Sequence, residues 1–253
     1  MPAATDSGHF TDRPHDLTIG VLGGMGPLAT VDFFGALVRM TPADRDWNHL
    51  HIVVDNNPRM PSRSRAFLFQ ESSPVPYLLA GAQRLVAMGA HLVVVPCNSA
   101  SYFLAPVRAA VAVPVLDPVT ATAAIIVTGQ GAERPPLRPL VLGGMVTHQA
   151  ELYGQALAGT HVTPVRPTDD EQDEVVALIE ALKRGGHSEA VVEPLVERVE
   201  ALVTAGMARG ADSVILGCTE FGLIAARLSA RLPVYDSNEL LARKALELAR
   251  ALL

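Results

Sequence analysis

The 253-residue sequence contains only two cysteines and one tryptophan, and aromatic residues make up 5% of it. Two cysteines are too few for a disulfide scaffold, so we expect free thiols. No apolar run reaches the roughly 18 residues of a membrane span, and residues 1–16 lack the hydrophobic core of a signal peptide. These absences predict a cytoplasmic protein with no membrane partner, in which residues 1–16 form a disordered leader.

Runs of lysine and arginine are missing as well. The formal net charge is −6 and the isoelectric point is near 5.7, which argues against nucleic acid or an anionic membrane surface as a partner. Any anionic ligand must therefore be held by a few local cations. The 49% of hydrophobic residues is enough to bury one large core or two compact ones.

The sequence is rich in short apolar, β-branched runs, each followed by turn residues and then by a helical pattern. Continuous rather than alternating hydrophobicity is typical of parallel strands covered by helices on both faces, so the predicted fold class is α/β. The expected strands are Leu17–Leu22, Leu50–Val54, His91–Val95, Leu140–Leu142 and Ser213–Leu216, and the clearest helices are Thr30–Met40, Gln172–Lys183 and Val191–Arg209.

Capping and turn residues set some of the boundaries. Thr168 or Asp170 is expected to cap the helix that begins near Glu171, and Gly185-Gly186 is expected to end it. Pro74 and Pro76, which follow two serines, predict a surface loop.

Three segments recur along the chain in the same order, each at a spacing of about 120 residues. The pairs are Val21–Met25 with Val141–Met145, Ala87–Cys97 with Ala208–Cys218, and Val113–Asp117 with Leu232–Asp236. The repeat predicts two similar parallel-sheet α/β domains related by a pseudo-two-fold, with an active site at their interface. We place the first domain at 17–117, completed by 233–253, and the second at 118–232.

The repeat changes the interpretation of the two cysteines. A single cysteine in an apolar strand is more often a small buried hydrophobe than a nucleophile. Cys97 and Cys218, however, occupy equivalent positions where a strand ends, which is the edge where parallel sheets bind ligands. A helix that starts after each loop is expected to lower the thiol pKa below about 8.5. Two halves packed face to face would bring both thiols to one cleft.

Two facing thiols suit racemisation, which removes a proton from one face of a carbon and returns one to the other. The reaction needs one base and one acid of similar strength that exchange roles. It also needs hydrogen-bond donors for the carbanion. Asn98, Ser99 and Thr219 are candidates, together with backbone N–H groups of the glycine turn at Met25 and Gly26.

These residues resemble the cofactor-independent aspartate/glutamate racemases, in the aspartate racemase-like branch, from about Thr18 onward. The segments that carry the resemblance are IGVLGGMGPLATVD (19–32), NNPRMPSR (56–63), PCNSA (96–100), PTDDEQ (167–172) and GCTE (217–220). The resemblance implies interconversion of L- and D-aspartate or a related acidic amino acid, without a cofactor or a metal, by a homodimer. It further implies that Cys218 serves the L enantiomer and Cys97 the D enantiomer.

The resemblance also implies a clamp for the substrate's carboxylates. Arg63 offers a planar fork suited to a carboxylate, and Lys183 offers a point charge. From the residues alone, Arg63 is equally an ordinary loop arginine, and Lys183 equally complements a helix C-terminus. Asn56 and Thr147 are further candidates for substrate contact. Glu220 either influences the proton of Cys218 or caps the next helix.

Two departures from the family pattern affect the substrate. Ser101 stands where aspartate racemases commonly carry histidine, and Gly144-Met145-Val146 replaces a threonine-rich turn of which Thr147 alone is kept. Aspartate is the first choice, with glutamate, a broad range of amino acids, or another isomerisation or decarboxylation of a small dicarboxylate as alternatives.

Two other classes of protein remain open. Gly24 to Ala29 satisfies the dinucleotide-binding pattern G-x-G-x-x-A after a strand, but the acidic residue expected about 20 positions further on is missing. A dehydrogenase would also leave the repeat and both cysteines unexplained. A catalytically silent binding protein would keep the fold and the anion clamp and would need neither thiol.

Overall fold

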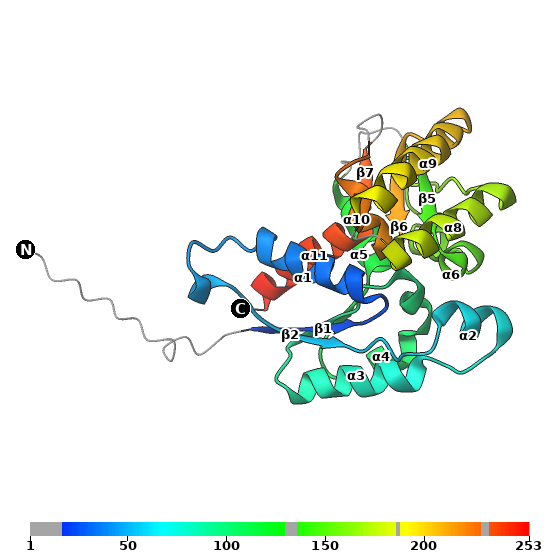
Figure 1. Ribbon diagram of the computed structural model, residues 1–253. Helices are drawn as coiled ribbons and strands as arrows, with labels where there is room; N and C mark the ends of the chain where they lie inside the picture. The colour runs from blue at the N-terminus through cyan, green and yellow to red at the C-terminus, as the bar shows by residue number, and fades with distance from the viewer. Residues whose placement is uncertain (1–16, 130–135, 186–187, 229–232, 253) are drawn as a thin grey trace, which may run out of the picture.

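The computed structural model describes residues 17–129, 136–185, 188–228 and 233–252, so the leader predicted over residues 1–16 lies outside the described part. The described strands form two parallel sheets (Figure 1), which confirms the α/β class. The first sheet has the order β2-β1-β3-β4 and the second the order β5-β6-β7. The strands are β1 (Thr18–Gly23), β2 (His51–Asn56), β3 (Leu92–Val94), β4 (Val115–Leu116), β5 (Pro139–Gly143), β6 (Ser213–Gly217) and β7 (Val234–Asp236).

Helices and short 3₁₀ segments connect the strands. The helices are α1 (Pro27–Met40), α2 (Arg63–Phe69), α3 (Val75–Ala87), α4 (Ala105–Ala110), α5 (Pro118–Gly129), α6 (Met145–Gln149), α7 (Leu152–Ala156), α8 (Asp169–Gly185), α9 (Glu189–Ala208), α10 (Gly222–Ala225) and α11 (Ser237–Ala251). The 3₁₀ segments are η2 (Asp46–Asn48), η3 (Asn98–Phe103) and η4 (Thr219–Phe221).

The central strands are buried along their whole length. Every residue of β1, β3, β5 and β6 is buried, as the continuous apolar runs predict. Strand β2 lies at the edge of its sheet and alternates between partly buried and exposed residues. The central strands therefore form inner layers of the molecule. A binding site is expected at the carboxyl ends of such strands.

The two sheets repeat the same strand order. β1-β3-β4 corresponds to β5-β6-β7 in both order and direction. Beside β5, isolated parallel bridges join Leu137 to Val162 and Leu140 to Val165, in the place that β2 occupies beside β1. This equivalence supports the predicted duplication, while the pseudo-two-fold itself stays a prediction.

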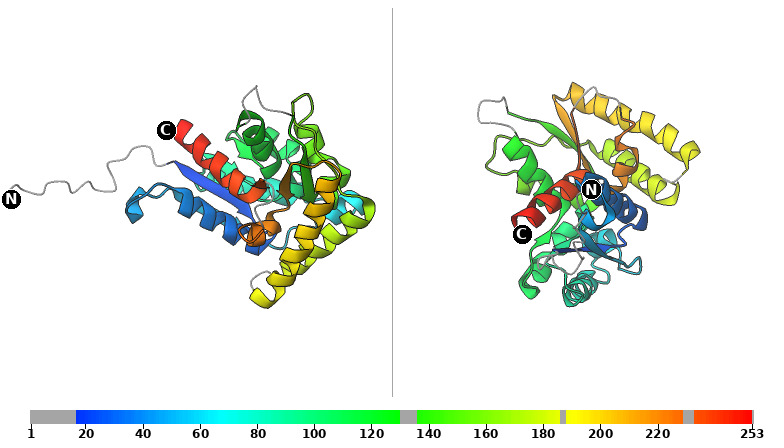
Figure 2. Two further views of the ribbon diagram at one scale, coloured as in Figure 1. Left: turned by 90° about the horizontal axis from the view of Figure 1, so that it is seen from above. Right: turned by 90° about the vertical axis from the view of Figure 1, so that its left-hand side faces the viewer.

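Helices cover both faces of each sheet. In the first half, α1 and α11 pack on one face and α3 and α4 on the other. In the second half, α8 and α9 cover one face, and α5 and α7 cover the other. The C-terminal helix α11 lies beside α1 (Figure 2), and its Leu241 and Ala245 join the same apolar cluster as Ile19 and Phe33 of the first half. The domain boundaries given above remain predictions.

The start of α8 agrees with the capping residues predicted from the sequence, whereas the start of α3 lies within a predicted loop. The backbone N–H of Glu171 donates to Thr168 Oγ1 and the N–H of Thr168 donates to the Glu171 carboxylate, a reciprocal cap at the start of α8. The loop predicted at Pro74 and Pro76 is wrong in part. Helix α3 begins at Val75, with Pro76 in its first turn, where a proline loses no helical hydrogen bond.

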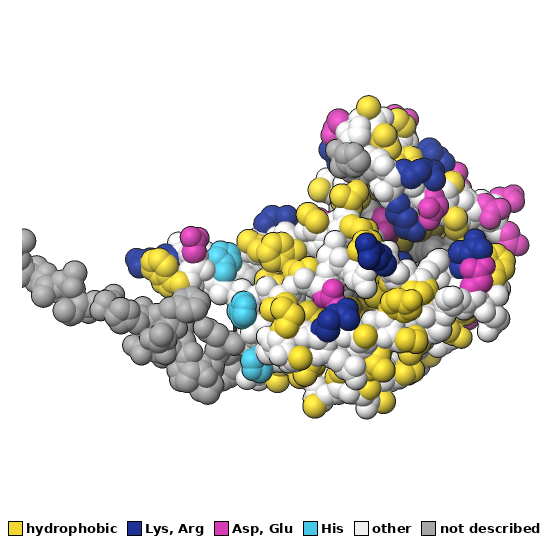
Figure 3. Space-filling view, turned by 60° about the horizontal axis from the view of Figure 1, so that its bottom comes forward, with side chains coloured by type: hydrophobic (Ala, Val, Ile, Leu, Met, Phe, Trp, Pro, Cys, Tyr) yellow, Lys and Arg dark blue, Asp and Glu magenta, His cyan; other side chains and the backbone are white. Residues whose placement is uncertain are grey.

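Among the described residues, no helix has both the length and the apolar character to cross a membrane. Figure 3 shows side chains of both charge signs gathered on the lobe that carries the second sheet, while the face below it is richer in hydrophobic and uncharged surface.

Candidate active site

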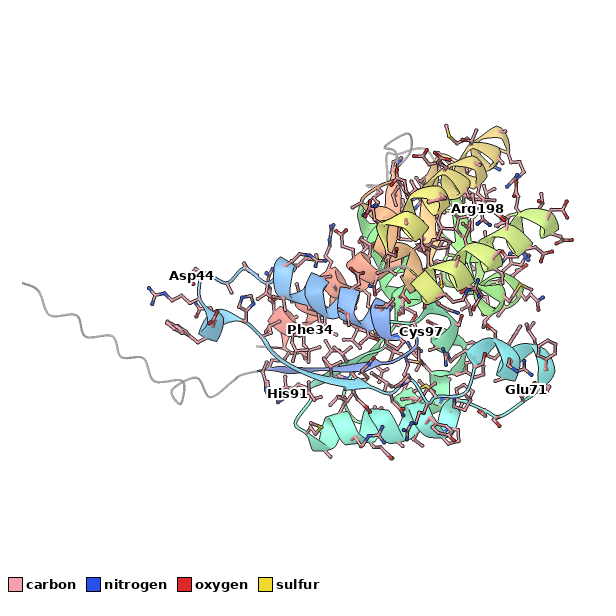
Figure 4. The ribbon with its side chains drawn as sticks, viewed as in Figure 1. Phe34, Asp44, Glu71, His91, Cys97 and Arg198 are labelled. Carbon is pink, nitrogen blue, oxygen red and sulfur yellow. The ribbon has the colours of Figure 1, made fainter. Side chains whose placement is uncertain are left out.

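The two cysteines occupy matching backbone positions. Cys97 follows β3 and precedes η3, and Cys218 follows β6 and precedes η4. Both have extended backbones, with φ of −158° and −141°. Figure 4 marks Cys97 in the region where the two halves meet. Cys97 is buried, Cys218 is partly buried, and both are free thiols.

One pocket brings the two thiols together. Among the described residues it is lined by Met25, Ser62, Arg63, Ser64, Cys97, Asn98, Ser99, Lys183, Cys218, Thr219 and Glu220. The predicted site residues Gly26, Asn56 and Thr147 do not line it, so their contact with a substrate stays a prediction. Ser62 and Ser64, which flank Arg63, were missed, although Ser62 lies in the segment that carries the resemblance.

The loop that carries Arg63 is held against the first glycine turn. Gly24 has φ of +89°, and a Cβ there would meet the backbone of Asn57 at 2.3 Å, so only glycine fits. Ser62 then caps α2 by accepting from the N–H of Arg65. Arg63 is thereby placed at the first position of α2, at the pocket.

One N–H group of the Arg63 guanidinium is available to a ligand. Its Nη1 donates to the carbonyl of Pro61 at 2.8 Å. Its Nε is buried and has no hydrogen-bond partner within the described part of the chain. A buried donor without a partner is costly, and a ligand carboxylate would satisfy it.

Lys183 lies near the end of α8 and also lines the pocket. Its Nζ donates to Glu180 Oε1 at 2.8 Å. Burial by itself lowers the pKa of Lys183, but Cys218 and the carboxylates of Glu180 and Glu220 outweigh it, and the pKa is raised. Lys183 is therefore a second, stably charged cation at the pocket.

Glu220 and Cys218 interact directly. The thiol of Cys218 donates to Glu220 Oε2 at 2.9 Å. Burial, followed by the charge of Glu220 and this hydrogen bond, raises the pKa of Cys218 well above its ordinary value. Glu220 is 3% exposed, and its Oε1 is a buried atom for which the described residues offer no hydrogen-bond donor.

Burial also raises the pKa of Cys97, although the positive charge of Arg63 opposes it. The expectation that a helix start lowers both thiol pKa values is therefore wrong for this structure. The helical segments that follow the thiols are short 3₁₀ turns, and the loss of hydration outweighs their dipoles.

Asn98 joins the two halves behind the thiols. Its Nδ2 donates to Ser237 Oγ at 3.0 Å, and its Oδ1 accepts from the hydroxyl of Tyr153 at 2.7 Å. Ser237 in turn donates to the carbonyl of Leu216, two residues before Cys218. The side chain of Asn98 thus fixes the Cys97 loop to the second half.

The two departures from the family pattern, Ser101 and the turn Gly144-Met145-Val146, have different surroundings. Ser101 donates to Asp117 Oδ1 at 2.7 Å and does not line the pocket within the described part of the protein. Gly144 lies closer to the site, since a Cβ there would stand 3.8 Å from Ser99 Oγ. Of the two, only the glycine turn borders a residue that lines the pocket.

A duplicated parallel α/β fold with a free thiol at the same strand end of each half defines a class of protein. Residues 22–245 match the Asp/Glu/hydantoin racemase family, and the chain belongs to it. The protein is thus a member of a racemase family of isomerases, which favours an enzyme over both the dehydrogenase and the silent binding protein.

Individual relatives agree with this assignment. The chain is 26% identical to a broad-specificity amino-acid racemase of Bacillus subtilis, over 89% of this chain and 95% of the relative. An aspartate racemase of Picrophilus torridus superposes with a TM-score of 0.79 at 27% identity, over 92% of this chain and 94% of the other. An aspartate racemase homologue of Pyrococcus horikoshii gives 0.71 at 25% identity, over 92% and 99%.

Proposed function

We propose that the protein interconverts the L and D forms of an amino acid by exchanging the Cα proton between Cys97 and Cys218, with aspartate as the first candidate substrate. The observation that carries the proposal is that two free thiols, at equivalent positions of the repeat, line one pocket. Racemisation without a cofactor needs such a matched acid and base.

In the reaction, the thiolate of one cysteine takes the Cα proton and becomes a thiol. The thiol of the other cysteine gives its proton to the opposite face of the carbanion and becomes a thiolate. The net change is inversion at Cα, with the protonation states of the two cysteines exchanged. Arg63, Ser99 and Thr219 line the same pocket and would supply cationic or hydroxyl donors to the negative charge that develops on the substrate.

The surroundings of the two thiols support an unequal resting state. Burial raises the pKa of both thiols, but the charge of Arg63 opposes this at Cys97, whereas the charge and the hydrogen bond of Glu220 add to it at Cys218. Cys97 is therefore the thiol that ionises first and Cys218 the one that stays protonated. With the roles that the family resemblance implies, the resting enzyme is prepared for the D enantiomer.

An acidic side chain on the substrate is supported by the two cations of the pocket, Arg63 and Lys183. Two cations in one pocket match the two carboxylates of an acidic amino acid. The broad-specificity relative is the reason to keep a wider range of amino acids, glutamate included, as the second candidate.

The test is to incubate the purified protein with L-aspartate in deuterated water. We expect deuterium at Cα together with loss of optical rotation. Replacing either thiol, in Cys97→Ser or Cys218→Ser, is expected to reduce racemisation by about 10²- to 10⁴-fold. The matched control is Arg198→Gln, which breaks an exposed ion pair with Glu174 and should leave the rate unchanged.

Activity that survives in the Cys97→Ser/Cys218→Ser double variant would contradict the two-thiol mechanism. Chiral chromatography of aspartate, glutamate and other small acids then decides the substrate. A preference for glutamate would overturn the choice of aspartate and leave the mechanism standing.

We also propose that the enzyme works as a homodimer in the cytoplasm. Sedimentation equilibrium would then give twice the 26.8 kDa of the single chain. A monomer at working concentration would contradict the assembly without bearing on the chemistry.

A further inference from the structure

A second pocket lies in the second half, at the carboxyl end of β5. It offers about 160 Å³ to water-sized molecules and is lined by Val141, Gly143, Thr147, His148, Glu151, Tyr153, Gly154, Pro164, Arg166 and Pro167. Within the described part of the chain it shares no lining residue with the cysteine pocket. It is therefore separate from the site of the proposed racemisation.

One side of this pocket carries a cation and an anion. The guanidinium of Arg166 donates to the carboxylate of Glu151 and, at 3.3 Å, to the carbonyl of His148. His148 Nε2 lies 3.2 Å from Arg166 Nη2, and because arginine only donates, this nitrogen is an acceptor and the imidazole is neutral. Burial and the charge of Arg166 lower the pKa of His148 in agreement with this.

The rest of the lining is mainly apolar. The Val141 side chain and the ring of Tyr153 are buried, and Pro164 and Pro167 lie on the same segment as Arg166. A cavity of about 150 Å³ accommodates a molecule as large as benzene. The pocket therefore has room for a branched aliphatic or aromatic side chain.

We propose that this pocket binds an α-amino acid with an apolar side chain. The ligand's carboxylate pairs with Arg166, its ammonium group pairs with Glu151, and its side chain packs against Val141, Tyr153 and the prolines. Arg166 and Glu151 are each about half exposed, so their mutual ion pair contributes little to stability. A zwitterion replaces that pair with two charge-assisted contacts.

The pocket is connected to both cysteine loops. Tyr153, on its wall, donates to Asn98 beside Cys97. Thr147, also on its wall, donates to the carbonyl of Gly217 beside Cys218 at 3.5 Å. Two side chains of the pocket wall therefore hold residues that lie next to the two thiols.

Binding is tested by calorimetric titration of L-leucine and L-phenylalanine into the full-length Cys97→Ser/Cys218→Ser variant, in which no proposed turnover interferes. We expect saturable binding of at least one of them. Arg166→Gln and Glu151→Gln, added separately, should each weaken it by about 10-fold or more, the effect of losing one hydrogen bond to a charged group. For L-leucine, 4-methylpentanoate and 3-methylbutylamine, which lack its ammonium and its carboxylate respectively, should bind correspondingly weaker.

Two controls locate the ligand. Arg198→Gln breaks an exposed Arg–Glu pair on the outer helices α8 and α9 and should leave the affinity unchanged. Arg63→Gln alters only the cysteine pocket and should also leave it unchanged. The proposal is overturned if neither amino acid binds saturably, or if Arg63→Gln abolishes binding while Arg166→Gln does not.

Discussion

At the scale of single residues, the two halves of the repeat give their cysteines the same backbone and different neighbours. The residue two positions after Cys97 is Ser99, and the residue two positions after Cys218 is Glu220. Of these two residues, only Glu220 carries a carboxylate, and it accepts a hydrogen bond from the thiol of Cys218. The duplication therefore supplies a matched pair of thiols, and the carboxylate of Glu220 is one of the differences that make them unequal.

Glu220→Gln tests this inequality. Because the carboxylate raises the pKa of Cys218 both by its charge and by accepting its hydrogen bond, the neutral amide should lower that pKa. The measurement is the pH dependence of alkylation by iodoacetamide, followed for each cysteine by peptide mass spectrometry. The midpoint for Cys218 should move to lower pH, and that for Cys97 should move less.

The control is Glu174→Gln, on the exposed face of α8, which should shift neither thiol. An unchanged or higher midpoint for Cys218 in Glu220→Gln would show that burial alone sets its pKa.

At the scale of elements, Asp117 connects three of them. This fully buried carboxylate follows β4 and accepts hydrogen bonds from the N–H of Val119 at the start of α5, from Ser101 of η3 and from Arg108 of α4. Ser101, which replaces the histidine of the family pattern, thus supports the loop after Cys97 from behind. Ser101 itself does not line the cysteine pocket as it is described.

Asp117→Ala should therefore be among the most damaging substitutions outside the pocket. It leaves the Ser101 hydroxyl and the N–H of Val119 without their acceptor, at a cost of about 1–3 kcal/mol for each, whereas the Arg108 side chain, 38% exposed, stays accessible to water. Ser101→Ala removes one hydrogen bond and should cost about 1 kcal/mol. Urea unfolding followed by circular dichroism measures both, and equal losses for the two variants would contradict the central role of the carboxylate.

The sequence predicts the central elements well because they are buried on both faces. The apolar runs at β1, β3, β5 and β6 hardly allow another interpretation. The pairing of Val162 and Val165 beside β5 was not predicted, because only two isolated bridges form there and no long apolar run marks the segment. The loop predicted at Pro74 and Pro76 included the start of α3 because a proline in the first turn of a helix resembles a loop signal.

From the residues alone, the sequence predicts only those parts of the site that lie on the repeated segments. Cys97 and Cys218 follow from their equivalent strand ends, and Arg63 follows from the resemblance. The direction of the thiol pKa shifts was wrong because it depends on how deeply tertiary packing buries each sulfur, which no local pattern contains. Thr147 was assigned to the substrate, but it turns to the carbonyl of Gly217 and lines the neighbouring pocket.

At the scale of the whole molecule, the first and last helices meet over two carboxylates. Asp236 precedes α11 and accepts from the N–H of Asn238 at 2.9 Å, and Asn238 Nδ2 donates to Asp32 of α1 at 2.7 Å. A Cβ on Gly222 would lie within 3.4 Å of an oxygen of each carboxylate, so the two acids face the same glycine. The closure of the first half by the C-terminal helix therefore brings two partly buried acids together.

This junction makes stability depend on pH. Burial first, and then the charge of Asp32, raises the pKa of Asp236 from 3.8 to about 6. Because the folded-state pKa lies above the unfolded one, the folded protein binds this proton more tightly. The contribution of the group to stability is fully present below pH 3.8 and is lost as the pH rises through about 6. At neutral pH the ionised Asp236 is a net cost to the fold.

Asp236→Asn should remove that cost, because asparagine keeps the cap acceptor and carries no charge. Its free energy of unfolding, relative to the native sequence, should rise between pH 4 and pH 7 and level off with a gain of at most about 3 kcal/mol, from 1.4 kcal/mol per pKa unit. Urea titrations at several pH values measure the difference, with Glu247→Gln, exposed on α11, as the control. A difference that does not change with pH would mean that Asp236 ionises at little cost to the folded protein.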